Sequence, residues 1–519
     1  MAQLSVLMKT ARSVSLLIDD GSIVNTMNEY RVMLNGKELF VTNRTVFSIY
    51  DLSPSADYCV CVKNGDADFS VSFRTDDEPL TINVRDLGAK GDGVSDDTSF
   101  IQAAIMAVPN GGRILIPEGK YLITSLFLAS HIRIEIAKNA VLCADTSREN
   151  RVYFPGSIKT NDPDNDEYHL GTWEGNPLPM FAGIVTGINV EDVVIYGEGT
   201  IDGCASADNW WFEPKKMNVA YRPRMIFLNH CKDVKLQGFL LTNSPAWVMH
   251  PFFSDNLMFC DLRVINPKVS PNTDGLDPES CVNVDIVGVR FSLGDDCIAV
   301  KSGKIYMGQK YKRPSSNIHI WQCLMEDGHG AVTLGSEIAG GISDMTVEKC
   351  LFKSTDRGLR IKTRRGRGKQ CFLNNIVFDN IIMDNVMNPF TANMFYFCDP
   401  DGHEEYVQSR DVYPVDERTP KLGILKFSNI KATNAHVSAG YFDGLPESKI
   451  EAVVMENVDI SFAKDAKSGV PIMCDGINEM SKAGIVAKNV NRLVLKNVNI
   501  QGCNGEEVET INVDSFERD

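Results

Sequence analysis

Residues Asn256–Val264 read NLMFCDLRV and residues Asn283–Phe291 read NVDIVGVRF, so each unit begins with an Asn and continues as a short strand of alternating apolar side chains. Further units begin at Asn317, Asp344 and Asn375, which makes the successive spacings 27, 34, 27 and 31 residues. Such units bury a continuous core only when each stacks on the next, and a repeated strand and turn of this length predicts a parallel β-helix. We expect the Asn side chains to form a ladder along the turns, which is a structural role.

The composition limits what the chain can bind. Its 519 residues carry a formal net charge of -16. This argues against nucleic acid as the main partner, because phosphate binding needs a basic surface. No run approaches the roughly 18 apolar residues of a membrane span, so we expect no membrane partner. Residues Met1–Asp20 lack the pattern of a signal peptide, which favours a cytoplasmic location, although a signal peptide removed beforehand would leave the same sequence.

Cysteine spacing predicts no metal site. The 14 cysteines form no C-x-x-C pair and no His/Cys cluster at zinc spacing. Those within apolar segments, such as Cys260, Cys281, Cys323 and Cys350, are expected to be buried reduced thiols.

The N-terminal segment, residues 1–78, has a different pattern. Short alternating strands are separated by turn signals such as Asn35-Gly36 and Asn64-Gly65, which predicts a small β-sandwich. The run Leu52-Ser53-Pro54, with Tyr58 four residues on, resembles a fibronectin type III domain. Because such a fold does not specify a function, we expect a spacer or a stabilising cap.

The remaining residues, 79–519, are expected to form the β-helix domain. Asp96 or Asp97 can begin a helix that runs to about Ala107, with an apolar face. A helix there would cover the core that the first coil of a solenoid otherwise exposes.

Four polar motifs stand out between residues 272 and 362: Asn272-Thr273-Asp274, Gly294-Asp295-Asp296, Gly328-His329-Gly330 and Arg360-Ile361-Lys362. The gaps between them are comparable to single coils. Equivalent points on stacked coils therefore bring these motifs together on one face of the predicted helix.

These residues suit the hydrolysis of a glycosidic bond. That reaction needs two carboxyl functions, one to protonate the leaving oxygen and one to activate water or attack carbon. Asp295 and Asp296 are adjacent and repel each other, and Asp274 lies one coil away, so one of them can keep its proton near neutral pH. Arg360 and Lys362 point to the same side of a strand, where they can hold a uronate carboxylate.

Each motif alone is common on solvated turns and exposed strands; their order on neighbouring coils is what makes them informative. Together they resemble glycoside hydrolase family 28, the polygalacturonases. The resemblance includes Asn243-Ser244-Pro245-Ala246-Trp247 and Asp296–Gly303 and covers about residues 81–519.

The resemblance implies a right-handed parallel β-helix that hydrolyses α-1,4-linked galacturonate with inversion and without a cofactor or metal. Carried over, Asp295 is the general acid, Asp274 and Asp296 hold and activate water, and His329 tunes the acid. Arg360 and Lys362 hold the galacturonate next to the scissile bond. Stacked coils are compatible with the roughly 6.5–9.5 Å between carboxyls that an inverting enzyme needs.

Several features outside these motifs also suggest roles. His250 and Tyr396 are candidate substrate ligands, although each could equally be a packed core residue.

Residues 357–369 hold seven cations and no acid, a patch that could attract a polyanion to an acidic protein. The insertion at residues 144–180 predicts a loop that blocks one end of the cleft, so that the enzyme trims chains from the non-reducing end.

Alternatives remain open. An endo-polygalacturonase, or a hydrolase of rhamnogalacturonan or xylogalacturonan, would carry the same motifs. A calcium-dependent pectate lyase shares the β-helix, and so does a non-catalytic carbohydrate-binding solenoid, although a binder has no need for three clustered aspartates. The sequence does not indicate an oligomeric state.

Overall fold

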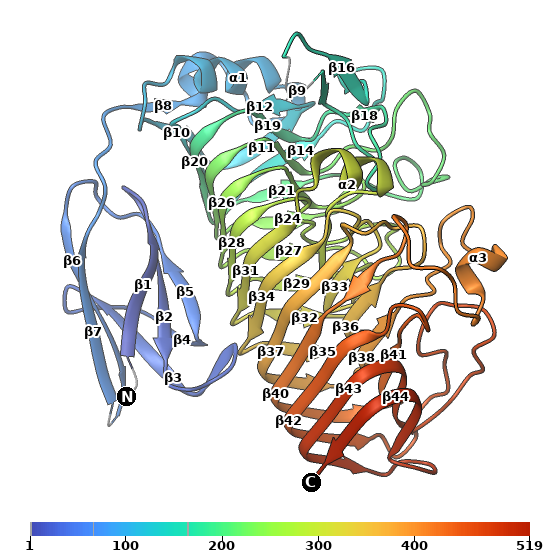
Figure 1. Cartoon of the computed structure of the whole chain (residues 1–519). Coiled ribbons are helices and arrows are strands. Elements are labelled where there is room, and N and C mark those ends of the chain that lie inside the picture. Colours follow the sequence, from blue (N-terminus) through green and yellow to red (C-terminus); the bar gives the residue numbers. More distant parts are fainter. Residues whose placement is uncertain (1–2, 66, 163–165) are drawn as a thin grey trace.

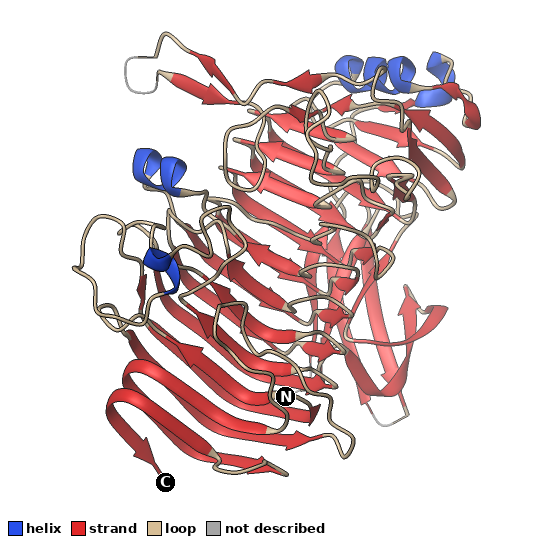
Figure 2. Ribbon diagram, turned by 90° about the vertical axis from the view of Figure 1, so that its right-hand side faces the viewer, coloured by secondary structure: helices blue, strands red, loops and turns tan. Residues whose placement is uncertain are grey.

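The computed structural model describes residues 3–65, 67–162 and 166–519, and almost every element in it is a strand (Figure 1). From residue 81 onward the chain winds into coils whose parallel strands stack in layers along one axis, as Figure 1 and Figure 2 both show. This confirms the predicted parallel β-helix. None of the helices in the described ranges has the length and hydropathy needed to span a membrane.

The coils have three faces, which we call A, B and C in the order in which the chain passes through them. Face A contains β8 (Thr81–Asn83), β10 (Arg113–Ile116), β13 (Arg133–Ile136), β20 (Glu191–Gly197), β23 (Lys232–Gln237), β26 (Asp255–Cys260), β28 (Val282–Val287), β31 (Ser315–Trp321) and β34 (Ile342–Glu348). Face B contains β9 (Asp92–Asp96), β11 (Gly119–Ile123), β14 (Ala140–Ala144), β21 (Thr200–Asp202), β24 (Leu240–Thr242), β27 (Arg263–Ile265), β29 (Arg290–Ser292), β32 (Leu324–Glu326) and β35 (Leu351–Lys353).

Face C carries the candidate site. It contains β12 (Leu126–Phe127), β19 (Val185–Ile188), β22 (Ile226–Asn229), β25 (Met249–Phe252), β30 (Ile298–Val300), β33 (Val332–Gly335), β36 (Arg357–Lys362), β38 (Asn388–Asn393) and β41 (Ser438–Asp443). In the last coils, longer strands continue round the corners: β37 (Phe372–Asp384), β40 (Ile424–Ala435), β42 (Ile450–Phe462), β43 (Ala483–Gln501) and β44 (Val508–Arg518).

The repeated Asn residues form the expected ladder. Asn283 Nδ2 donates to Asn256 Oδ1 at 2.8 Å, and Asn317 Nδ2 donates to Asn283 Oδ1 at 2.7 Å. All three have positive φ, a left-handed conformation that Asn tolerates better than most residues. The Asn at each corner therefore both turns the chain and links one coil to the next.

Helix α1 (Thr98–Ala107) caps the first coil and buries Ile101, Ala104 and Ile105. Asp97 occupies the N-cap position but its side chain forms no capping bond, while Asp96 Oδ1 accepts from Thr98 N, at the first residue of the helix, at 2.9 Å. The Asp97 carboxylate instead accepts from the backbone of Lys90 at 2.6 Å and Gly91 at 2.9 Å. Both aspartates thus fix the entry to the helix.

The N-terminal segment folds as two antiparallel sheets around their own apolar core. One sheet has the order β1-β2-β5 and the other β4-β3-β6-β7. The bounds are β1 (Gln3–Lys9), β2 (Val14–Asp19), β3 (Asn25–Leu34), β4 (Lys37–Arg44), β5 (Val46–Ile49), β6 (Asp57–Asn64) and β7 (Ala67–Arg74). The sandwich was expected; its kinship to fibronectin type III domains stays a prediction.

The sandwich packs against the outside of face A (Figure 1). Met8, Leu17 and Val46 form an apolar cluster with side chains of β20, β26 and β28. Gln322 is buried between the two parts, and its Oε1 accepts from Val24 N at 2.8 Å and from Thr45 Oγ1 at 2.9 Å. The sandwich therefore covers part of face A, a different face from the one that carries the site.

Candidate active site

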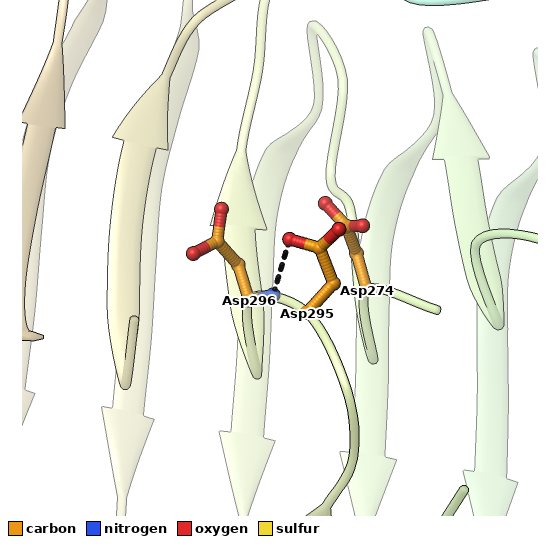
Figure 3. A group of neighbouring side chains, drawn as sticks. All are labelled: Asp274, Asp295 and Asp296. Atoms are coloured by element: carbon orange, nitrogen blue, oxygen red, sulfur yellow. Dashed lines mark hydrogen bonds between the residues drawn. The ribbon is translucent and has the colours of Figure 1, made fainter. Parts of the chain in front are cut away.

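The three aspartates lie together where the chain enters face C (Figure 3). Gly275 N donates to Asp296 O at 3.0 Å, and Cys297 N donates to Gly330 O at 2.8 Å. These bonds align three successive coils, so Asp274, the Asp295-Asp296 pair and His329 become neighbours. One oxygen of each aspartate lies within 4.8 Å of the others.

Asp296 is fully buried and held by two cations. Its Oδ1 accepts from Arg360 Nη1 at 2.9 Å, and its Oδ2 accepts from Lys362 Nζ at 2.8 Å. Burial opposes ionisation, but Lys362 and Arg360 outweigh it and hold the pKa of Asp296 well below its usual value. Asp296 is therefore a permanent carboxylate.

Arg360 and Lys362 do share one side of β36, as their spacing predicted, but their first partner is Asp296. The second arm of Arg360, Nη2, contacts Met473 Sδ at 3.0 Å. Because a thioether is a weak acceptor, this arm can exchange it for a uronate carboxylate without releasing Asp296.

Asp274 has the opposite environment. Burial raises its pKa well above the usual value, the charges of Asp295 and Asp277 add to the rise, and Lys301 at 3.7 Å opposes it. Asp295 is half-buried and accepts a hydrogen bond from Asp296 N at 2.9 Å. Asp274 therefore favours its protonated form, next to the Asp295 carboxyl. The site therefore combines a fixed charge with a movable proton.

His329 lies beside Asp295, and its Nδ1 is 2.7 Å from Asp356 Oδ2. That hydrogen bond raises the pKa of His329, although burial opposes the rise. Asp356 was not predicted from the sequence, since a single Asp before a strand carries no distinctive signal. It orients the imidazole and favours its charged form.

A cleft of about 560 Å³ opens on face C above these groups. Its lining includes Asp274, Asp295, His329, Arg360, Lys362 and Tyr396. Tyr396 thus lies beside the cleft, with its ring centroid 5.7 Å from Lys362 Nζ. Asp296 lies below the lining and acts on the cleft through its two cations.

His250 was a candidate substrate ligand, and this prediction is wrong. Its side chain is fully buried and does not line the cleft. Nε2 is 2.8 Å from Glu279 Oε2, and the Trp247 ring packs edge-on at 4.9 Å. Trp247, which does line the cleft, covers the histidine. His250 is therefore a packing and hydrogen-bonding residue of the wall.

Lys301 is a residue of the site that the sequence did not single out. It is buried, and its Nζ lies 3.0 Å from Glu337 Oε2, 3.4 Å from Asp277 Oδ1 and 4.3 Å from the Trp247 ring centroid. Strand alternation could have found it, because Lys301 follows β30 at an outward-facing position. It links the floor of the cleft to Asp274.

Comparison with known proteins decides the family. The profile of "Glycosyl hydrolases family 28" matches residues 152–482. The chain belongs to glycosyl hydrolases family 28. A second profile, "Rhamnogalacturonase A/epimerase, pectate lyase-like", matches residues 81–156, the first coils.

A probable polygalacturonase from Vitis vinifera is 30% identical over 405 residues, which cover 76% of this chain and 77% of that protein. The family 28 exopolygalacturonase of Yersinia enterocolitica superposes with a TM-score of 0.67 at 18% identity, over 100% of this chain and 98% of that one. A hyperthermoactive exopolygalacturonase from Thermotoga maritima gives 0.62 at 24% identity, over 77% and 93%. At these identities the two structures support the fold alone.

The three clustered aspartates also raise the question whether this part of the cleft could bind a metal ion. Three clustered carboxylates could hold a cation. However, both oxygens of Asp296 already bind Arg360 and Lys362, and these positive charges would repel a calcium ion. The donor set therefore fits hydrolysis better than calcium-dependent elimination.

The close approach of the aspartates bears on stereochemistry. Their oxygens are nearer than the roughly 6.5–9.5 Å between carboxyls in most inverting glycosidases. The observed spacing therefore does not by itself support inversion, which stays a prediction from the family resemblance.

The cation run at residues 357–369 is not a free basic patch, and this interpretation is wrong. Arg364 pairs with Asp399 and Asp401, Arg365 with Glu447, and Lys369 with Glu417. These cations hold loops in place, and acids far along the chain neutralise them.

Proposed function

We propose that this family 28 hydrolase releases galacturonate units from the non-reducing end of α-1,4-linked galacturonate chains. The Vitis vinifera relative supports the substrate, since it is named a probable polygalacturonase. Arg360 and Lys362 beside the catalytic carboxylates suit a substrate with one carboxylate per sugar.

In the proposed mechanism, Asp295 protonates the glycosidic oxygen and is then re-protonated by Asp274. Asp274, now a carboxylate, receives a proton from the attacking water, while Asp296 stays a carboxylate and helps to hold that water. His329, whose charged form Asp356 favours, stabilises the carboxylate that Asp295 becomes. The products are two saturated sugars with inverted configuration at the new reducing end.

The insertion that borders the cleft supports the proposal of end-wise action. In the insertion, β16 (Ser157–Lys159) pairs with β17 (Glu167–His169), and their connection at 163–165 lies outside the described residues. This hairpin binds helix α2 (Ile305–Tyr311) through Lys310–Asp166 at 3.0 Å. Farther along, Lys304 N donates to Gly175 O at 3.0 Å. The insertion therefore forms one wall of the cleft, at Glu174.

The position of this wall indicates which end of the substrate enters. Arg360 and Lys362 come from coils that follow the aspartates, and the family resemblance gives them the sugar on the leaving-group side. The wall at Glu174 is built by an earlier segment of the chain, and its tip rests against Lys304 and Glu337. We propose that it closes the side that holds the non-reducing end.

Product analysis tests the proposal. We expect trigalacturonate and long polygalacturonate to release saturated galacturonate from the first time point, with no effect of EDTA. A fast fall in the viscosity of long polygalacturonate would show endo action. An unsaturated product that disappears with EDTA would show a lyase, and preference for rhamnogalacturonan or xylogalacturonan would reassign the substrate.

A further inference from the structure

The tip of the cleft wall is a tight two-residue turn. Trp173 and Asn176 pair with each other through two backbone hydrogen bonds of 2.9 and 3.1 Å. Between them, Glu174 has φ 45° and Gly175 has φ 73°. Positive φ at both central positions is the pattern of the type I′ turn. It is unusual for Glu, so the turn must be held by its surroundings.

The surroundings of the turn do hold it. Trp173 stacks on Tyr221 with ring centroids 4.6 Å apart and an interplanar angle of 8°, and the Arg224 guanidinium lies 4.7 Å from the Trp173 ring. A Cβ atom on Gly175 would lie 2.8 Å from Glu337 Cβ and 2.8 Å from Lys304 N. The turn is therefore pressed against the cleft wall, and the position of Glu174 is fixed.

Glu174 itself lines the cleft and is half-buried. Among the described residues, no hydrogen bond or ion pair engages its carboxylate. Two other acids of the lining are bound, Glu337 by Lys301 and Asp399 by Lys304.

The charge of Glu174 acts on the nearby Arg222 and Arg224, which favours the ionised carboxylate without occupying its oxygens. A carboxylate oxygen held in place with no hydrogen-bond donor can receive a hydrogen bond from the substrate.

The chemistry of a chain end fits a carboxylate at this position. The last unit of an α-1,4-linked chain at the non-reducing end has a free 4-hydroxyl group, which can donate a hydrogen bond. An internal unit has a glycosidic oxygen there, which can only accept. A carboxylate can only accept as well, and it repels the carboxylate of any further uronate.

We propose that Glu174 recognises the non-reducing end by accepting a hydrogen bond from the terminal hydroxyl and by rejecting an internal unit. This specificity role rests on the proposed function, because it presumes that the chain end reaches the closed side of the cleft. In this proposal, end-wise action depends on hydrogen bonding and charge at the terminal unit as well as on steric exclusion by the wall.

The test uses two variants and a matched control. Glu174→Gln removes the charge at constant size, and Glu174→Asn shortens the side chain while giving the Asn-Gly sequence that type I′ turns favour. Glu213→Gln is the control, since Glu213 is an exposed acid of a nearby loop, and its ion pair within the described part of the chain is with Lys216. Thermal unfolding checks that all variants fold.

The substrates are trigalacturonate and the trimer whose terminal unit is 4,5-unsaturated and therefore lacks the 4-hydroxyl group. We expect the wild type to prefer the saturated trimer by roughly 10- to 100-fold in kcat/KM, because the unsaturated trimer has no 4-hydroxyl group to donate a hydrogen bond to the Glu174 carboxylate. In Glu174→Asn, whose amide no longer reaches the hydroxyl group, this preference should fall to within about threefold, mainly through slower cleavage of the saturated trimer, and in Glu174→Gln, which keeps a neutral acceptor, it should fall partly. The control should keep it.

The outcomes separate the two proposals. If the wild type releases single units but folded Glu174 variants keep its preference, Glu174 does not read the chain end and the proposed function stands. If the wild type shows no preference between the two trimers, the inference also fails. If the wild type cuts long chains internally, the proposed function fails and the role of Glu174 fails with it.

Discussion

The ion pairs of Asp296 give the sharpest test of the site. Replacing Lys362 with Met keeps most of the side-chain volume but leaves the buried carboxylate with Arg360 alone. Because Asp296 is fully buried and Lys362 is only 10% exposed, solvent screens this ion pair little. The variant isolates the charge of one cation.

The size of the effect follows from burial. Removing one partner of a buried ion pair costs about 3–5 kcal/mol, because the remaining charge is left uncompensated. Lys369→Met is the matched control, since Lys369 lies in the same segment but pairs with Glu417 at exposed side-chain fractions of 51% and 69%. Exposed pairs contribute about 0–1 kcal/mol. Lys362→Met should therefore destabilise the protein several-fold more than the control.

Urea unfolding of a double-mutant cycle with Asp296→Asn measures the coupling directly. Once Asp296 carries no charge, losing Lys362 should cost about 1 kcal/mol or less, which gives a coupling energy of at least about 2 kcal/mol. If the two substitutions add within about 0.5 kcal/mol, the pairing does not hold Asp296 as a carboxylate and the reasoning is refuted. The single variant Lys362→Met should also raise KM for trigalacturonate, because Lys362 lines the cleft.

Three further predictions concern the acid, a buried carboxyl and the ladder. Asp295→Asn should lower kcat on trigalacturonate by about 10²–10⁴-fold with KM nearly unchanged, and steady-state kinetics would contradict the assignment if kcat were retained. Burial raises the pKa of Asp277 to about 7 in the folded protein, compared with the usual value of 3.8. Between these pH values the folded protein keeps a proton that the unfolded chain has lost, so the free energy of unfolding falls as pH rises, by up to about 4 kcal/mol. Asp277→Asn should flatten this dependence of the unfolding free energy on pH, and urea unfolding that showed the same dependence in the variant would refute the prediction. Asn283→Ala should lower the free energy of unfolding by about 1–3 kcal/mol, because it removes two ladder hydrogen bonds and places Ala at a positive φ. Asn283→Gly removes the same bonds without backbone strain and should lower it less. Equal losses in urea unfolding would show that backbone strain plays no part.

The sequence was informative where a rule with a fixed period applied. The ladder of Asn256, Asn283 and Asn317 could be predicted because coils repeat and because Asn tolerates the left-handed turn. The common side of Arg360 and Lys362 followed from the two-residue period of a strand. Coil-length gaps likewise placed the three aspartates at one edge of one face.

The sequence was uninformative where a partner lies across the cleft or comes from a loop. Strand alternation places His250 on the outside of face C, but it does not reveal that Trp247 covers it. The cations after residue 357 were read as a patch because their acids, such as Glu447, come from segments with no fixed register to them. Glu174 lies in an insertion without any repeat, so no period could connect it to the cleft.

The protein carries a net charge of -16 and still binds, in our proposal, a polyanion. The structure resolves this by local compensation. Asp296, Glu337 and Asp399 are each neutralised by bound cations, and the raised pKa of Asp274 favours its neutral form. Glu174 forms no ion pair among the described residues, although its charge acts on the buried Arg222 and Arg224. A uronate chain therefore meets mainly compensated acids along the cleft, and in our proposal the carboxylate of Glu174 meets it where the chain must stop, which links the electrostatics of the cleft to the direction of cleavage.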